Sequence, residues 1–136
     1  MRIVVIDGQG GGMGRALTER LRAAAPEAEI IAVGTNALAT AAMLRAGATA
    51  GATGENAVRV NCRQADVIAG PVGIVLADAL LGEITPEMAR CVAASPARKV
   101  LLPMQKCHIQ VAGVANLTTQ ELVEDAVKRI LEGQKS

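Results

Sequence analysis

The sequence predicts a three-layer α/β sandwich in which helices cover both faces of a mainly parallel sheet. Short, unbroken apolar runs alternate with segments of helical periodicity, and a glycine cluster follows the first apolar run. The chain has 136 residues, of which 51% are hydrophobic and 20% are charged. We expect residues 1–136 to form one domain that folds without a disulfide or a metal, because a chain of this length can bury a sizeable core.

The apolar runs predict strands at residues 3–6, 30–33, 67–69, 100–102 and 109–114. The helical segments run from the glycine cluster to about residue 25, and then over residues 37–46, 56–63, 72–81, 86–94 and from 119 onward. Residues 47–54 contain the tripeptide Gly-Ala-Thr twice and fit either an edge strand or a loop.

Several of these helices begin at residues whose side chains can cap the first turn. Thr85 precedes a proline and an acidic residue, which is typical of a helix start. Thr118 and Glu121 have the spacing of a capping box. Either Thr35 or Asn36 can cap the helix that follows the second strand.

The order of the segments predicts how the strands are arranged. Right-handed crossovers place the first strand near the centre, with the second strand on one side and the third and fourth on the other. The link between residues 102 and 109 is too short for a parallel crossover, so we expect an antiparallel final strand. The chain reverses direction beside the first strand, and Rossmann-like folds bind ligands at that point, outside the carboxyl ends of the strands.

The glycine cluster lies at this point and contains five glycines in seven residues. Its backbone amides and the following helix N-terminus would bind an anion, and the absence of a following lysine excludes an ordinary P-loop. We predict a nucleotide or dinucleotide site here; the alternative is a tight turn that needs glycine only for packing. The predicted contacts come from Gly8, Gln9, Gly10, Gly11, Gly12, Met13 and Gly14.

Residues beyond the glycine cluster bear on which cofactor would bind. Folds that bind NAD carry an acidic residue after the second strand, whereas this chain has Gly34, Thr35 and Asn36 there. We therefore expect NADP or NAD with no preference for NAD. Thr35 and Asn36 would line the site together with Gly70, and a simple helix cap is the alternative role of the first two.

The candidates for chemistry at the same edge of the sheet are weak. Asp7 would repel a pyrophosphate unless it binds a hydroxyl or a cation, or points away. The remaining candidates are Glu55, Lys106, Cys107 and His108. Adjacent residues on a strand point to opposite faces, so we expect Cys107 and His108 not to act on one atom and Cys107 to be an ordinary thiol. No cysteine spacing predicts a metal site.

Four stretches resemble a family of short bacterial proteins known only as a domain of unknown function. They are IVVIDGQGGGMGRAL, GTNALATAAMLRAGATAGATGENA, GPVGIVLADALLGEITPEMA and KCHIQVAGV. The spacing of Gly8, Gly12 and Gly14 is also similar to the loop of short-chain dehydrogenases. Their catalytic tyrosine is absent, because the chain contains no tyrosine.

The composition of the chain limits the classes of binding partner. A net charge of +1 and the absence of aromatic residues argue against nucleic acid, and no apolar run is long enough to span a membrane. We expect the protein to be cytoplasmic and to bind a small-molecule nucleotide or anion. We also expect it to form a homo-oligomer, because so apolar a chain has little polar surface with which to cover itself. The alternative function is a non-enzymatic ligand or anion sensor, or a structural subunit of an assembly.

Overall fold

The computed structural model describes residues 1–104 and 108–133 of the chain. Five parallel strands form one sheet in the order β3-β2-β1-β4-β5, so β1 is central as predicted. The strands are β1 (Arg2–Asp7), β2 (Glu29–Gly34), β3 (Ala50–Thr53), β4 (Val67–Pro71) and β5 (Arg98–Leu102). The helices are α1 (Gly12–Ala24), α2 (Ala37–Arg45), α3 (Glu55–Gln64), α4 (Pro86–Ala94) and α5 (Thr119–Glu132), with a short 3-10 helix η1 (Val72–Val75).

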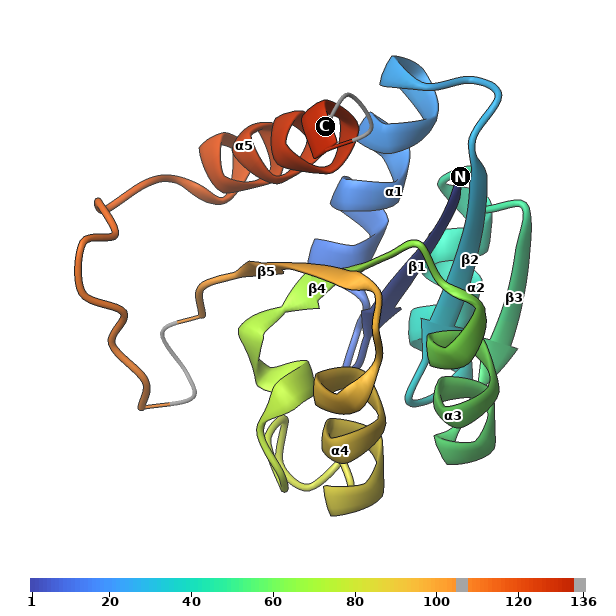
Figure 1. The fold of residues 1–136 in the computed structure, drawn as a ribbon, viewed down its shortest axis with the longest axis vertical. Helices are drawn as coiled ribbons and strands as arrows, with labels where there is room; N and C mark the ends of the chain where they lie inside the picture. Colours follow the sequence, from blue (N-terminus) through green and yellow to red (C-terminus); the bar gives the residue numbers. More distant parts are fainter. Residues whose placement is uncertain (105–107, 134–136) are drawn as a thin grey trace.

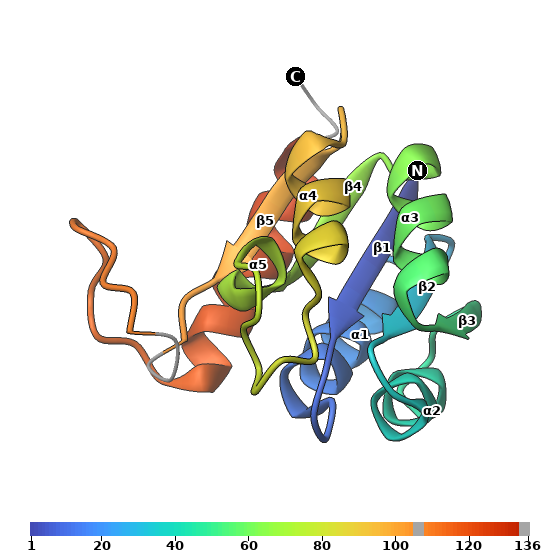
Figure 2. The same cartoon turned by 90° about the horizontal axis from the view of Figure 1, so that it is seen from below.

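Helices cover both faces of the sheet, which gives the three predicted layers (Figures 1 and 2). The central strand β1 is buried on both sides because its apolar residues alternate between two cores. Ile3 and Val5 pack with residues of α1, α2 and α5, whereas Val4 and Ile6 pack with residues of α3 and α4. The residues 47–54, for which the sequence left two alternatives, contain β3, which pairs with β2 at the edge of the sheet.

The predicted antiparallel final strand is wrong. Within the described residues the sheet ends at β5, and residues 108–117 form an arm that loops away from the sheet before α5 (Figures 1 and 2). A turn at Gly113, whose φ is +85°, interrupts the apolar run. The alternation of Ile109 and Val111 is therefore not that of a strand in this sheet.

The predicted helix over residues 72–81 is also wrong. The 3-10 helix η1 ends at Val75, and turns follow up to the start of α4. Ile74 and Ile84 are both buried in the core beneath α3 and α4, so the segment between them must fold back. It reverses through left-handed backbone at Asp78, Leu80 and Leu81.

The predicted caps are confirmed. Asn36 Oδ1, rather than Thr35, accepts from Ala39 N at 2.9 Å and caps α2. Thr85 Oγ1 accepts from Met88 N at 3.1 Å and caps α4, and Thr118 and Glu121 form both bonds of the capping box of α5. None of the helices in the described parts of the chain has the length and apolar content that crossing a bilayer requires.

Candidate functional site

The candidate site lies where β1 ends and the chain reverses direction. From β1 the chain crosses to β2 on one side, and β4 pairs with β1 on the other. Three connections meet at this edge of the sheet: the glycine turn (residues 8–11), the start of α2 at Thr35 and Asn36, and the segment 76–85 before α4.

Packing accounts for three of the five glycines. A Cβ added at Gly8 would lie 2.6 Å from Thr35 Oγ1, and one at Gly14 would lie 2.8 Å from Asp7 Cβ. Gly11 has a φ of +73° at the N-cap of α1, and a Cβ there would lie 2.8 Å from the Cα of Ala39. These glycines let the turn lie against its neighbours.

Packing does not account for Gly10 and Gly12. A Cβ at either position would meet no atom within 4 Å, both residues are exposed, and neither has a left-handed φ. The backbone amides of Gly10, Gly12 and Met13 have no acceptor among the described residues. These two glycines therefore leave the backbone donors at the start of α1 open to approach from outside.

The side chain of Asp7 is buried against the glycine turn. Its side chain is 5% exposed; Oδ1 accepts from Gly8 N at 2.8 Å and Oδ2 from Gly14 N at 2.6 Å. Burial raises the pKa of the Asp7 carboxyl, while the two backbone hydrogen bonds lower it and the charge of Glu83 raises it further. Asp7 thus bonds to backbone amides and fixes the shape of the turn.

Glu83 reaches the same turn from the segment before α4. Its Oε1 accepts from Thr35 Oγ1 at 2.5 Å, from Asn36 Nδ2 at 2.8 Å and from Gln9 N at 2.9 Å. The hydrogen bond from Thr35 is the largest cause that lowers the pKa of Glu83, and the bonds from Gln9 and Asn36 lower it further. Glu83 is therefore an ionised acceptor at neutral pH, and all three of its donors are neutral groups.

Sequence reasoning missed Glu83 because it treated residues 72–81 as a helix and gave no role to the residues that follow. The only local signal is the preceding Gly82, which marks a turn. Thr35 and Asn36 lie beside the glycine turn. The Thr35 hydroxyl donates to Glu83, while Asn36 also donates to Gln9 O at 2.9 Å.

Other candidates are not brought to the turn. A Cβ at Gly70 would lie 2.2 Å from Ile6 O, so this buried glycine serves the close approach of β4 to β1. Glu55 accepts from Thr85 Oγ1 at 2.6 Å and pairs with Arg59 at 3.6 Å. His108 is exposed on the arm, and Lys106 and Cys107 lie outside the described residues.

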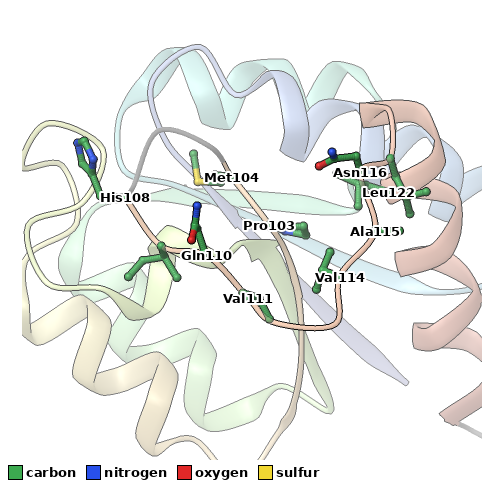
Figure 3. Close-up of a pocket in the computed structure, with 11 residues that line it drawn as sticks. Pro103, Met104, His108, Gln110, Val111, Val114, Ala115, Asn116 and Leu122 are labelled. Atoms are coloured by element: carbon green, nitrogen blue, oxygen red, sulfur yellow. The ribbon is translucent and has the colours of Figure 1, made fainter.

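A separate hollow of about 650 Å³ lies between the arm and the body of the protein (Figure 3). Its walls include Pro103 and Met104 after β5, Val111 and Val114 of the arm, and Leu122 of α5. Among the lining residues that the structure describes, His108 is the only acidic or basic side chain. In the parts of the chain that the structure describes, no three metal-ligating side chains come together.

Residues 2–135 match the family described as "Domain of unknown function (DUF3842)". The chain belongs to this family. No curated protein matches the chain.

Two solved structures are similar to this DUF3842 protein. One is a dodecameric FMN-dependent UbiX-like decarboxylase from Escherichia coli O157:H7, with 17% identity, a TM-score of 0.57, and coverage of 100% of this chain and 96% of that chain. The other is AibC, with 18% identity, a TM-score of 0.48, and coverage of 97% of this chain and 39% of that chain. The decarboxylase establishes likeness of fold: a Rossmann-like α/β sandwich with a parallel sheet.

Proposed function

We propose that this DUF3842 protein binds a nucleotide cofactor whose phosphate lies over the amides of Gly10, Gly12 and Met13. The observation that carries the proposal is that two exposed glycines remain after packing has accounted for the others. A side chain at either would stand over open backbone donors, and glycine there permits a ligand to approach closely.

The site combines two kinds of hydrogen-bonding group. The first-turn amides of α1 present donors and a partial positive charge, which favours a phosphate. The carboxylate of Glu83 is an acceptor beside them, which favours a hydroxyl. A nucleotide carries both groups, whereas inorganic phosphate offers no sugar hydroxyl. FMN joins NAD and NADP as a probe, because the decarboxylase of similar fold is FMN-dependent.

The test is a titration of the wild-type protein with FMN, NAD, NADP and inorganic phosphate, followed by thermal unfolding and calorimetry. We expect at least one nucleotide to raise the melting temperature. At 100 times its dissociation constant, the nucleotide should add about 2.7 kcal/mol to the free energy of unfolding. Stabilisation by phosphate alone would favour an anion sensor, and no stabilisation by any of the four probes would contradict the proposal.

The variant Gly12→Ala separates binding from folding. Alanine at the start of α1 should raise the free energy of unfolding by up to about 1 kcal/mol, because glycine loses more backbone entropy on folding. Its methyl group should nevertheless weaken nucleotide binding at least about tenfold, a loss of about 1.4 kcal/mol.

Gly113→Ala is the matched control. It adds the same methyl group in open space on the arm, but at a φ of +85°. We expect it to lose stability and to keep nucleotide affinity, the reverse of Gly12→Ala. A Gly12→Ala protein that binds nucleotide as tightly as the wild type would contradict the proposed position of the phosphate.

We also propose that copies of the chain associate through the arm. Four of its apolar side chains are between 41% and 49% exposed, an unusual density for one short segment. These are Ile109, Val111, Val114 and Leu117. The dodecameric assembly of the decarboxylase of similar fold supports the proposal.

A further inference from the structure

We infer that Glu83 accepts a hydrogen bond from a ribose hydroxyl of the bound nucleotide and thereby selects an unmodified ribose over one that carries a 2′-phosphate. This inference rests on the proposed nucleotide site and names the part of the ligand that Glu83 recognises. Neither the strand order nor the glycine cluster by itself implies it, because Glu83 comes from the segment before α4.

The carboxylate of Glu83 is held in place and keeps one oxygen unused. Oε1 accepts from a backbone amide and from two side chains, those of Thr35 and Asn36. Asn36 is itself fixed, because its Oδ1 caps α2. Oε2 has no hydrogen-bond donor among the described residues, and Glu83 is half-buried rather than enclosed. A ligand hydroxyl can therefore donate to an acceptor whose position is already fixed.

Glu83 also lies where a ribose would have to be. It is beside Gly8 at the end of β1, since a Cβ on Gly8 would lie 3.1 Å from its Oε1. It contacts Thr35, the first residue after β2, where dinucleotide-binding folds place an acidic residue for the ribose hydroxyl. Gln9, whose amide it binds, directly precedes Gly10 of the proposed phosphate site.

The charges at this place disfavour a 2′-phosphate. Glu83 takes part in none of the ion pairs of residues 1–104 and 108–133, so no Lys or Arg of these ranges pairs with its charge. The donors that a 2′-phosphate would need, the Thr35 hydroxyl and the Asn36 amide, already bind Glu83. A 2′-phosphate beside this carboxylate would meet a like charge, and the open amides of Gly10, Gly12 and Met13 would already hold the other phosphate of the ligand.

The experiment compares the dissociation constants of NAD and NADP, which differ only in the 2′-phosphate, for the wild type, Glu83→Gln and Glu27→Gln. Glu27 is exposed at the opposite end of β2 and provides a matched control for the same substitution. We expect the wild type and Glu27→Gln to bind NAD at least about tenfold more tightly than NADP. This replaces the sequence-based expectation of no preference, because Glu83 supplies an acidic group from a segment that the sequence did not place at the site. In Glu83→Gln the ratio should fall to about one, because the opposing charge is removed.

The ratio within each variant is the informative quantity, because a merely structural role of Glu83 would weaken both ligands equally and leave the ratio unchanged. An unchanged ratio in Glu83→Gln, or tighter binding of both dinucleotides, overturns the inference; the latter would mean that Glu83 competes with ligands for the turn. If Glu83→Gln does not fold, the wild-type ratio still decides, since equal affinities or a preference for NADP overturn the inference.

Two outcomes separate this inference from the proposed function. A wild-type protein that binds FMN but neither dinucleotide overturns the role of Glu83 and leaves the nucleotide site standing. A wild-type protein that binds none of the nucleotides overturns both.

Discussion

Two carboxylates bind the same glycine turn, and their surroundings shift their pKa values in opposite directions. Asp7 is buried beneath the turn, and burial penalises its charged form, so its pKa rises from an ordinary value of 3.8. Glu83 is less buried and receives three hydrogen bonds, so its pKa falls below 4.5. Asp7 thus accepts hydrogen bonds from the buried amides of the turn, and Glu83 accepts one from Gln9 at its half-buried side.

Opposite pKa shifts predict opposite pH dependence of stability. A raised pKa means that the folded state binds the Asp7 proton more tightly, so the stability that Asp7 contributes falls as pH rises above 3.8. A lowered pKa means that the contribution of Glu83 is present above pH 4.5 and is lost as pH falls through its folded value. We expect the difference in unfolding free energy between wild type and Asp7→Asn to decrease with pH, and that between wild type and Glu83→Gln to increase.

Urea unfolding at a series of pH values between about 3 and 7 measures both differences. Asp7→Asn should also lose about 1–3 kcal/mol of stability at every pH, because one of two backbone amides loses its acceptor. Two differences that change in the same direction with pH would contradict the assigned shifts.

The described cysteines should be unreactive in the folded protein. Burial raises the pKa of Cys62 to about 12, and burial followed by the nearby Glu87 raises the pKa of Cys91. We expect iodoacetamide at about pH 8 to label neither of them until urea is added, because the thiolate is the reactive form. Peptide mass spectrometry identifies the labelled sites, and labelling of Cys62 or Cys91 in the folded state would contradict this prediction. Labelling of the folded protein then reports on Cys107 alone.

At the scale of elements, the segment 76–85 is where packing prevails over local preference. Asp78 N donates to Ile84 O at 2.7 Å and Ile84 N to Ala79 O at 3.1 Å, so the segment closes on itself and returns Ile84 to the core. Leu80 and Leu81 have φ values of +56° and +57°, which cost about 1–2 kcal/mol each for residues with a side chain. Burial of Ile84 and the bonds of Glu83 offset this cost.

Leu81 is the residue at which this strain can be relieved, because its side chain is 96% exposed and packs against little. We expect Leu81→Asn to raise the free energy of unfolding by about 0.5–1 kcal/mol, since asparagine adopts left-handed backbone readily. Leu38→Asn is the control: Leu38 is 74% exposed but lies in α2. In this helix asparagine is a poorer helix former than leucine, so the substitution should lower the free energy of unfolding by roughly a few tenths of a kcal/mol. Chemical denaturation measures both, and a loss of stability in Leu81→Asn would contradict the prediction.

At the scale of the whole molecule, the arm leaves apolar side chains without a covering layer, and the strand β5 lies at the edge of the sheet. Among the described residues, β5 pairs only with β4, and the one backbone hydrogen bond found for the arm lies within it, from Val114 N to Val111 O at 3.4 Å. An edge strand followed by an exposed apolar segment favours association with another chain.

We therefore expect wild-type protein at micromolar concentration to scatter light as a dimer or larger assembly. The double variant Val111→Lys, Val114→Lys should give a mass near that of one 13.9 kDa chain, because two charges would be buried in the interface. Val60→Lys is the control, since Val60 is 39% exposed on α3, away from the arm. A wild-type monomer, or an assembly that the double variant leaves intact, would contradict the role of the arm.

The sequence by itself determined the features that depend on short-range patterns. Continuous apolar runs predicted four of the strands, short connections and right-handed crossovers predicted their order, and Thr85 and Thr118 marked helix starts through bonds to residues only three positions away. It also placed the glycine turn at the reversal of chain direction.

Only the tertiary structure decided which side chains meet that turn. Glu83 is 74 residues from Gln9 and 48 from Thr35, and no local pattern encodes contacts over such separations. The roles of Asp7 and Gly70 likewise depend on how closely other segments approach β1 and the start of α1. Residues 76–85 depart from their local helical preference because the burial of Ile74 and Ile84 outweighs periodicity within the segment. Residues 108–117 do not form the strand that their pattern favours, because they are not buried against the sheet.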